Sequence, residues 1–495
     1  MSTQLPPAPP SLPKKCRPLI IRLLIGLTIF ALVLPVLIPC LYLVEKYRGR
    51  AAWRAYETEA KARGVKLDFA DYIPPKIPDA ENFASIPLFD AVFRASDAKQ
   101  EVPNPFKLPE AKDGKLPKFA DPVKQERIDL AAWQKYFVEA KLLPAASDHA
   151  AAEVLTALDS FSGPLAQLRE AGARPHCRFP VHWEKAYAAP LPHMELLQSA
   201  SKLYALRLSA HLALGDSAAA YEDFRDGLRL TTATVGEPSL IAGLVRIAIA
   251  VAMENAVWDG LSGRQWAEPE LRKIQADLAT LDWLKDYALA MGSERGGSNV
   301  MIDMIIERPH QLDDLLQQGG TTMRNTLWFY PTGWFYQSKV RANHFFDELA
   351  ARIDPAERRF FPEREVPSSP TNITGQPQRF YYLFFAIMAP VLERVEKRFI
   401  QAATVTDHTR LACALERFRL ARGAYPEALA ELAPEFIAAV PVEIVNGEPY
   451  RYRRTDDGSF LLYSVGTDLR DDGGVIDPKA SASKQADWVW RYPAK

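Results

Sequence analysis

The chain has 495 residues, 48% of them hydrophobic and 24% charged, so it can bury a sizeable core spread over roughly two to four domains. A formal net charge of −1, with no basic stripe interleaved with aromatic residues, argues against a nucleic-acid-binding protein. Four cysteines do not make a disulfide framework. Cys177 and Cys413 could pair, but a free buried thiol is the expected state of each.

Residues 1–22 form a proline-rich basic tail that we expect to be disordered. Residues 23–44 carry no charge and are long enough to cross a bilayer core of about 30 Å as a helix, kinked at Pro35 and Pro39. A cleaved signal peptide or a lipoprotein signal is the alternative. No A-x-A site follows, however, and Pro39 next to Cys40 spoils a lipobox. The sequence predicts a transmembrane anchor that is not cleaved.

The orientation of this anchor is not decided by charge, because equal numbers of basic residues flank its two ends. Long C-terminal domains are translocated largely regardless of flanking charge. We therefore expect a single-pass protein of the inner (cytoplasmic) membrane, with the N-terminus inside and the C-terminal body periplasmic or otherwise extracytoplasmic.

Residues 45–122 predict a helix followed by a wrapping segment. The stretch 51–63 is a good helix that should continue out of the membrane and end at Gly64. Prolines spread over residues 72–87 predict an extended segment, and residues 101–122 a polar surface loop.

Residues 123–400 predict a helical body, because several segments repeat apolar residues with the helical period. These segments are 151–168, 196–214, 217–232, 238–258 and 269–291. The second and third resemble one tetratricopeptide-type hairpin, but no second copy follows at a fixed period, so an irregular helical bundle is favoured. The apolar segment 239–252 contains Arg246, and we interpret it as a core helix rather than a second span.

One cluster in this body could carry chemistry. His176, Cys177, His182 and His193 lie close together in sequence and could form a zinc site or a Cys–His pair. The segment is a proline-rich loop without C-x-x-C or H-E-x-x-H spacing. A deep pocket lined by His176, His182 and Glu184 would indicate an extracytoplasmic hydrolase or ligand-binding protein.

Other familiar site motifs are missing from the sequence. It contains no Walker loop, no G-x-S-x-G and no dinucleotide-binding fingerprint in context. The glycine-containing stretches 294–297 and 331–334 predict local turns. The aromatic residues 334–336 could form a binding patch, although core packing is the favoured interpretation.

Residues 401–495 predict a small α+β module. A helix over 405–419 has its apolar residues on one face, and Gly423 is placed to cap its C-terminal end. Residues 450–453 alternate aromatic and charged side chains, whereas 459–465 are apolar almost throughout. We expect two antiparallel strands joined by a hairpin at 455–458. The predicted fold class is therefore α+β and mostly α: one transmembrane helix, an irregular helical bundle and a C-terminal helix-plus-antiparallel-sheet module.

An acidic loop in this module is the candidate metal site. Asp468, Asp471 and Asp472 lie next to several glycines, and Asp487 follows later. Calcium relieves the repulsion of packed carboxylates by taking about six to eight oxygen ligands, and glycines let a loop wrap around the ion. The alternative is a solvated acidic turn, since Asp and Gly are ordinary turn residues and no EF-hand pattern is present.

The stretches LERFRLARGAYPEAL, VPVEIVNGEPYRYR and LLYSVGTDLRDDGG resemble the soluble domain of type II secretion major pseudopilins, over about residues 404–490. The resemblance implies a helix packed on a small antiparallel sheet, with Ca²⁺ bound in the last loop. Carried over by position, Ser464 and Val465 would lie near backbone ligands, and Asp468 with Asp471, Asp472 or Asp487 would supply side-chain ligands.

The chain departs from that family in two ways. Ala31 stands where a pilin-type anchor would have its glutamate, and residues 45–400 separate the anchor from the module. A pilus subunit is therefore not expected. The whole layout resembles uncharacterised membrane-anchored proteins of the planctomycete and verrucomicrobia type, which implies no activity.

Three functional hypotheses follow. The first is a non-enzymatic, membrane-anchored envelope protein that presents a pseudopilin-like interaction module to an envelope or secretion-system partner, with a structural calcium loop. The second is the hydrolase or ligand-binding protein that would use the loop 176–193. The third is a helical protein-binding scaffold in which the module is merely structural.

Overall fold

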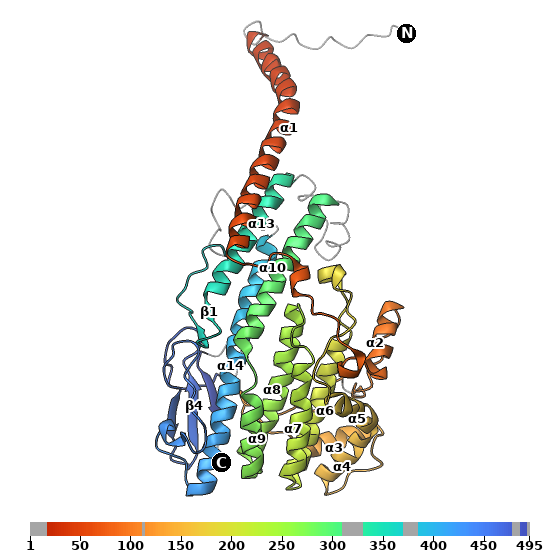
Figure 1. Cartoon of the computed structure of the whole chain (residues 1–495), viewed down its shortest axis with the longest axis vertical. Coiled ribbons are helices and arrows are strands. Elements are labelled where there is room, and N and C mark those ends of the chain that lie inside the picture. The colour runs from red at the N-terminus through yellow and green to blue at the C-terminus, as the bar shows by residue number, and fades with distance from the viewer. Residues whose placement is uncertain (1–16, 111–113, 309–329, 370–384, 478–485, 493–495) are drawn as a thin grey trace, which may run out of the picture.

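The computed structural model describes the chain except for residues 1–16, 111–113, 309–329, 370–384, 478–485 and 493–495. The described chain is mostly α, with two small antiparallel sheets near its C-terminal end, in agreement with the predicted class. Long helices form a bundle from which α1 projects at one end, while strand β4 and its neighbours lie beside α14 toward the other end (Figure 1).

Helix α1 (Arg17–Ala62) is one continuous helix of 46 residues that contains both the predicted span and the predicted helix after it. Its first half stands clear of the body (Figure 1), and residues 25–44 are exposed throughout although they are apolar. Its second half is packed, with Tyr56 and Ala60 only 4% and 0% exposed. Gly64, at a φ of +74°, follows the helix end as predicted.

The body consists of helices that pack side by side. They are α2 (Pro87–Asp97), α3 (Leu130–Glu139), α4 (Ala150–Leu158), α5 (Ser162–Ala171), α6 (His193–Ala213), α7 (Ser217–Thr232), α8 (Leu240–Ser262), α9 (Glu268–Leu278), α10 (Trp283–Glu307), α13 (Thr332–Ala351) and α14 (Phe385–Arg422). The packing runs from α1 through α13, α10, α14 and α8 to the pair α6 and α7.

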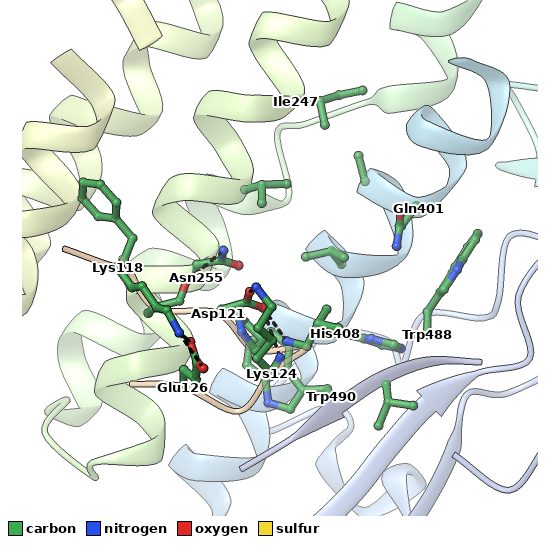
Figure 2. A pocket seen from close by; sticks show the side chains of 18 of the residues that line it. Lys118, Asp121, Lys124, Glu126, Ile247, Asn255, Gln401, His408, Trp488 and Trp490 are labelled. Atoms are coloured by element: carbon green, nitrogen blue, oxygen red, sulfur yellow. Dashed lines mark hydrogen bonds and ion pairs between the residues drawn. The ribbon is translucent and has the colours of Figure 1, made fainter. Parts of the chain in front are cut away.

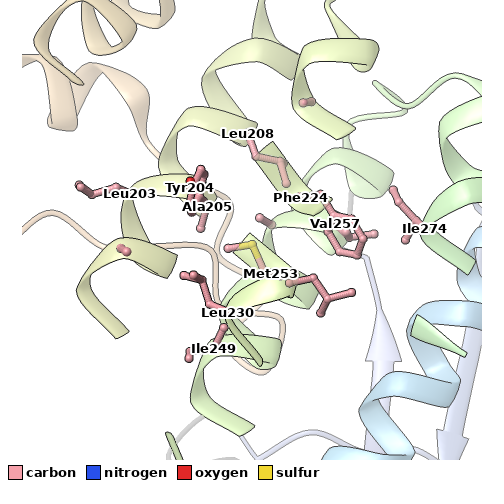
Figure 3. Close-up of a cluster of buried hydrophobic side chains, with 14 of the residues drawn as sticks. Leu203, Tyr204, Ala205, Leu208, Phe224, Leu230, Ile249, Met253, Val257 and Ile274 are labelled. Atoms are coloured by element: carbon pink, nitrogen blue, oxygen red, sulfur yellow. The ribbon is translucent and has the colours of Figure 1, made fainter. Parts of the chain in front are cut away.

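The predicted hairpin is present as α6 and α7. Gly215 has a φ of +80°, and the side chain of Asp216 accepts a hydrogen bond from Ala219 N at 2.9 Å, which caps α7. Figure 3 shows side chains of α6, α7, α8 and α9 gathered in one buried cluster. A Cβ atom on Gly227 of α7 would lie 2.2 Å from the sulfur of Met253, so this glycine lets α7 and α8 approach closely.

Two predicted helices are divided in the structure. Segment 151–168 is interrupted by a 3-10 turn at Asp159–Phe161, which separates α4 from α5. Segment 269–291 is divided between α9 and α10, because the side chain of Asp282 accepts a hydrogen bond from Lys285 N at 3.1 Å and starts a new helix.

The two predicted turns were wrong. Residues 294–297 lie inside α10, and residues 331–334 lead into α13. A Cβ atom on Gly296 would lie 2.7 Å from the Cα of Phe69, in the 3-10 helix Phe69–Tyr72. The glycine therefore serves close packing between two segments rather than a turn. Phe335, in the predicted aromatic patch, is buried.

Within the described residues, two helices are long and apolar enough to cross a membrane, α1 from Ile25 and α8. The apolar window of α8 is 50% buried, and α8 packs against α6, α7 and α14. Arg246 of α8 is buried and forms an ion pair with Asp286 of α10. These contacts are those of a core helix, as the sequence predicted.

The C-terminal sheet has the order β3–β4–β5 and is antiparallel, with β3 (Arg451–Arg454), β4 (Phe460–Ser464) and β5 (Trp488–Arg491). All five residues of β4 are buried, as predicted for a strand covered on both faces. A small sheet of β1 (Ile353–Asp354) and β2 (Arg359–Phe360) precedes α14. The predicted glycine positions are also confirmed, with φ of +84° at Gly423 after α14 and +72° at Gly458 in the hairpin.

The body and the C-terminal module share a core. Helix α14 runs through residue 400 without interruption, and Leu415 and Phe460 belong to the same buried cluster as Trp133 and Leu208. Trp258 of α8 also donates a hydrogen bond to the backbone oxygen of Arg491 at 3.0 Å. The domain boundaries at residues 122 and 400 stay predictions, although no break in α14 marks the second.

Helices α1 and α13 cross at two glycines. A Cβ atom on Gly49 would lie 2.2 Å from the backbone oxygen of Gly333, and one on Gly333 would lie 2.0 Å from the backbone oxygen of Glu45. Backbone therefore meets backbone at this crossing, and any larger side chain would separate the helices. Tyr56 and Arg63 of α1 continue the contact through hydrogen bonds to Asp347 of α13, each 2.9 Å long.

We predict that Gly333→Ala lowers the free energy of unfolding by about 2 kcal/mol or more, because the methyl group must push two backbones apart. Thermal unfolding of the full chain in detergent measures the effect. Gly163→Ala is the matched control, since a Cβ atom there meets nothing within 4 Å, and it should leave the midpoint unchanged or raise it. Equal midpoints for Gly333→Ala and the parent would contradict the close crossing.

Candidate functional site

The acidic loop is organised by a carboxylate that is fully buried. Asp487 is 0% exposed, and its Oδ2 accepts hydrogen bonds from Asp472 N at 3.1 Å and Gly474 N at 2.8 Å. Its other oxygen, Oδ1, is buried without a hydrogen-bond partner among the described residues. Burial, the largest influence, raises the pKa of Asp487. The buried side chain of Asp487 therefore fixes the backbone of the loop at Asp472 and Gly474.

A second buried acid, Glu443, lies behind the predicted backbone ligands. Its Oε2 accepts hydrogen bonds from Ser464 Oγ at 3.1 Å and from Val465 N at 3.4 Å. Burial raises the pKa of Glu443 to about 7, and the charge of Asp487 adds to that shift. Its Oε1 also lacks a partner among the described residues. The sequence reasoning did not single out Glu443.

The other three aspartates are exposed and are engaged by local groups. Asp471 accepts hydrogen bonds from Tyr463 Oη at 3.0 Å and Gly473 N at 2.9 Å, and its Oδ2 lies 3.4 Å from Arg451. The bond from Gly473 N is the main cause of a lowered pKa at Asp471. Asp468 accepts a turn hydrogen bond from Arg470 N, at 3.2 Å. The side chain of Asp472 is exposed, and its backbone N–H donates the hydrogen bond to Asp487 described above.

Among the described residues, no group of three or more His, Cys, Asp or Glu side chains is arranged to hold a metal ion. The feature that fits a cation best is the pair of unpartnered carboxylate oxygens, Oδ1 of Asp487 and Oε1 of Glu443. Both belong to carboxylates that are 0% exposed, and hard cations take such oxygens together with backbone carbonyls. The buried acids Asp487 and Glu443 are therefore the better candidates for cation ligands. Asp471 is already paired with Arg451.

The histidine cluster is split between different environments. His193 is 0% exposed, and its Nε2 lies 3.1 Å from Glu237, while its ring stacks on Phe179 at a centroid distance of 3.9 Å. His182 is partly exposed and lies near Asp97 and Glu184, at 3.3 and 3.1 Å.

The remaining members of that cluster also have structural roles. The backbone of His176 bonds to Glu81 and Phe83, at 3.1 and 2.8 Å. Cys177 and Cys413 are free thiols, and burial raises the pKa of both. These surroundings favour structural roles over nucleophilic chemistry, because a thiol needs a lowered pKa to react readily.

A run of buried polar residues in α14 is the main feature that the sequence reasoning missed. Thr406, Asp407, His408 and Thr409 are at most 4% exposed. Asp407 accepts hydrogen bonds from Tyr450 Oη at 3.1 Å and from two arginines, Arg358 and Arg410, each at 3.2 Å. Burial nevertheless raises the pKa of Asp407.

This run separates two cavities. Thr406 and Asp407 line a polar cavity of about 420 Å³ that also contains Arg358 and Arg410. His408 lines a larger cavity, of about 640 Å³, on the other side of α14. Burial lowers the pKa of His408 to about 3, so its imidazole is neutral at physiological pH. The signal in the sequence was a Thr-Asp-His-Thr run between two mostly apolar stretches of α14.

Glu254 of α8 is buried against this run. Trp283 Nε1 donates to Thr406 Oγ1 at 2.9 Å, and Thr406 Oγ1 donates to Glu254 Oε1 at 2.6 Å. The other oxygen of Glu254 has no partner among the described residues. Burial raises the pKa of Glu254 to about 8, so the carboxyl is mostly protonated at neutral pH.

Comparison with known proteins does not add to this description. No protein-family model, no curated protein and no solved structure matches the chain.

We predict that Glu254 makes the protein less stable as the pH rises. Its pKa is about 8 in the folded state against 4.5 in its ordinary state, so the folded chain holds a proton between these values that the unfolded chain has lost. The free energy of unfolding should fall from pH 5 to pH 9, and Glu254→Gln should remove roughly 3 kcal/mol of that fall.

Chemical denaturation in detergent at pH 5, 7 and 9 measures this dependence. Glu139→Gln, at an exposed position on α3, is the control and should keep the parental pH profile. A Glu254→Gln profile parallel to that of the parent would show that Glu254 is not the group responsible.

Proposed function

We propose that the chain is a non-enzymatic envelope protein that is anchored in the inner (cytoplasmic) membrane by residues 23–44. The observation that supports this most strongly is α1, because the exposed apolar half and the packed half are one helix. A cleaved signal peptide is released from the protein that follows it. Here the helix that would follow the cleavage site crosses α13 at Gly49.

In this proposal the body is extracytoplasmic and holds the C-terminal module at a distance from the bilayer. The sheet lies toward the end of the body opposite the apolar half of α1 (Figure 1). Strand β3 is the edge of its sheet, and Arg453 and Arg454 are exposed there. This edge and the acidic loop are the parts of the module that a partner protein would meet. The link to a secretion system rests on the resemblance of residues 404–490 to pseudopilins.

The surroundings of the histidines favour this proposal over the hydrolase. His193 is enclosed by Phe93, Phe179 and Glu237 rather than placed beside exposed His182. A general base must reach its substrate within hydrogen-bond distance, which an imidazole that is 0% exposed does not do.

We predict that the body is extracytoplasmic. A Lys135→Cys variant carries a new thiol at an exposed position of α3, whereas Cys413 is buried and Cys177 is only partly exposed. A membrane-impermeant maleimide should label Lys135→Cys in intact cells with a permeable outer envelope, above the background of the parent chain. Labelling that requires lysis of the inner membrane would reverse the proposed orientation.

We also propose that the acidic loop binds Ca²⁺ as a structural ion, with Asp487 and Glu443 as its buried carboxylates. The full chain should then unfold at a higher temperature in Ca²⁺ than in chelator, because a ligand that binds only the folded state stabilises it by about 2.7 kcal/mol at 100 times its Kd.

Two variants test where such an ion binds. Asp487→Asn should abolish the calcium-dependent shift, and Asp456→Asn in the exposed hairpin should retain it. Loss of the shift in Asp468→Asn would instead support the ligand set that the pseudopilin resemblance implies. An unchanged midpoint of the parent at millimolar Ca²⁺ would leave the loop as an acidic turn held by Asp487.

A further inference from the structure

The larger cavity beside α14 is enclosed by parts of the chain that are distant in sequence. Its walls come from the loop at residues 116–126, from α8, α14 and strand β5, and from Lys202 of α6 (Figure 2). Its volume of about 640 Å³ falls in the range of small-molecule binding sites, about 300–1,000 Å³. The loop that closes it is fixed by a hydrogen bond from Asn255 to the backbone oxygen of Ala120, 3.3 Å long.

Most of the wall is apolar. Phe119 comes from the loop, Ile247 and Val251 from α8, Val405 from α14 and Val489 from β5. All five are partly exposed, so they present apolar surface to whatever fills the cavity. Burial of such surface by a ligand is favourable by about 25 cal/mol per Å². An occupant of this cavity therefore needs an apolar body.

The charges around the cavity are not balanced. The two acids in its lining each have a lysine partner: Glu126 is 2.9 Å from Lys118, and Asp121 is 3.1 Å from Lys124. Two further cations in the lining, Lys202 of α6 and Arg398 of α14, have no acidic partner among the described residues. Both are exposed, as expected for charges at a cavity mouth. The surplus charge is positive.

The buried polar groups of the wall do not offset this charge. The indole Nε1 of Trp488, which can only donate, has no partner among the described residues. The imidazole of His408 is neutral, because burial lowers its pKa to about 3. Gln401 and Asn255 are neutral amides. No carboxylate in the described lining is left to attract a cationic ligand.

We propose that this cavity binds a small amphiphilic organic anion, a carboxylate with an acyl chain, whose apolar body lies between α8 and β5 and whose head group meets Lys202 or Arg398. The chemistry follows from the two properties of the wall together. An apolar cavity alone would accept a neutral molecule, and cations alone would accept any anion. This binding site is independent of the calcium loop and of the membrane anchor.

The position of the cavity indicates where such a ligand comes from. Helix α8 and the sheet of β4, to which β5 belongs, lie in the part of the body away from the apolar half of α1 (Figure 1). A lipid held in the bilayer would not reach that far. The favoured ligand is a water-soluble carboxylate with a chain of medium length rather than a membrane phospholipid.

Binding is measured by equilibrium dialysis of the full chain in zwitterionic nanodiscs, with uptake by empty nanodiscs subtracted. The probes are decanoate, decylammonium of the same chain length, and an anionic lysophospholipid. We expect saturable binding of decanoate with one site per chain, at least tenfold tighter than decylammonium. Tighter binding of the lysophospholipid would overturn the assignment to a free carboxylate.

Variants separate the two parts of the wall. Lys202→Gln combined with Arg398→Gln should weaken decanoate binding by at least about tenfold, since a hydrogen bond to a charged group is lost. Lys135→Gln on α3, outside the cavity, should have no effect. Val251→Trp should fill the cavity and abolish binding, and Ile247→Phe serves the same purpose if Val251→Trp does not fold.

Three further results would overturn the proposal. The first is uptake by the full chain no greater than by empty nanodiscs. The second is equal affinity for decanoate and decylammonium. The third is parental decanoate affinity in a folded variant whose cavity is filled.

Discussion

The crossing of α1 and α13 is the contact on which the proposed role of the protein depends. At Gly49 and Gly333 the two helices meet backbone to backbone, and Tyr56 and Arg63 fasten the next turns of α1 to Asp347. The exposed apolar half of α1 is continuous with this fastened half. The apolar half is therefore attached to the body through an uninterrupted helix.

Helix α14 connects the remaining parts. It packs against α8, α9 and α10, and it supports β4 and β5 on the module side. Because it is enclosed on several sides, its polar residues must find partners inside the protein. Asp407 pairs with Arg358 and Arg410 and accepts a hydrogen bond from Tyr450. Thr406 is hydrogen-bonded to Glu254 and Trp283. The same helix thus joins the body to the module and lines the two cavities, of about 640 and 420 Å³, on its two sides.

Local patterns in the sequence predicted the individual elements well. The apolar run before Val44, the helix break at Gly64, the hairpin at Gly215 and the cap at Gly423 depend on residues near each other in the chain. The buried strand β4 was also predicted, because its apolar run has no polar face.

Features that depend on distant contacts were not predictable in this way. Gly296 was taken for a turn because its partner, Phe69, is far away in sequence. Strand β5 was not predicted, because Trp488 and Trp490 belong to a strand only through its pairing with β4, which is distant in sequence. In the candidate metal loop, Asp487 was identified, whereas Glu443 was not, because the fold alone brings it behind Ser464. The cavity beside α14 combines five separate segments and has no single motif.

In the proposed function α1 remains attached to the mature protein and holds it in a membrane. The most direct test is the intact mass of the native protein after extraction from membranes washed with alkaline carbonate. The account predicts a carbonate-resistant protein whose mass includes residues 23–44. A mature chain that begins after Val44, or a full-length chain released by carbonate, would contradict it.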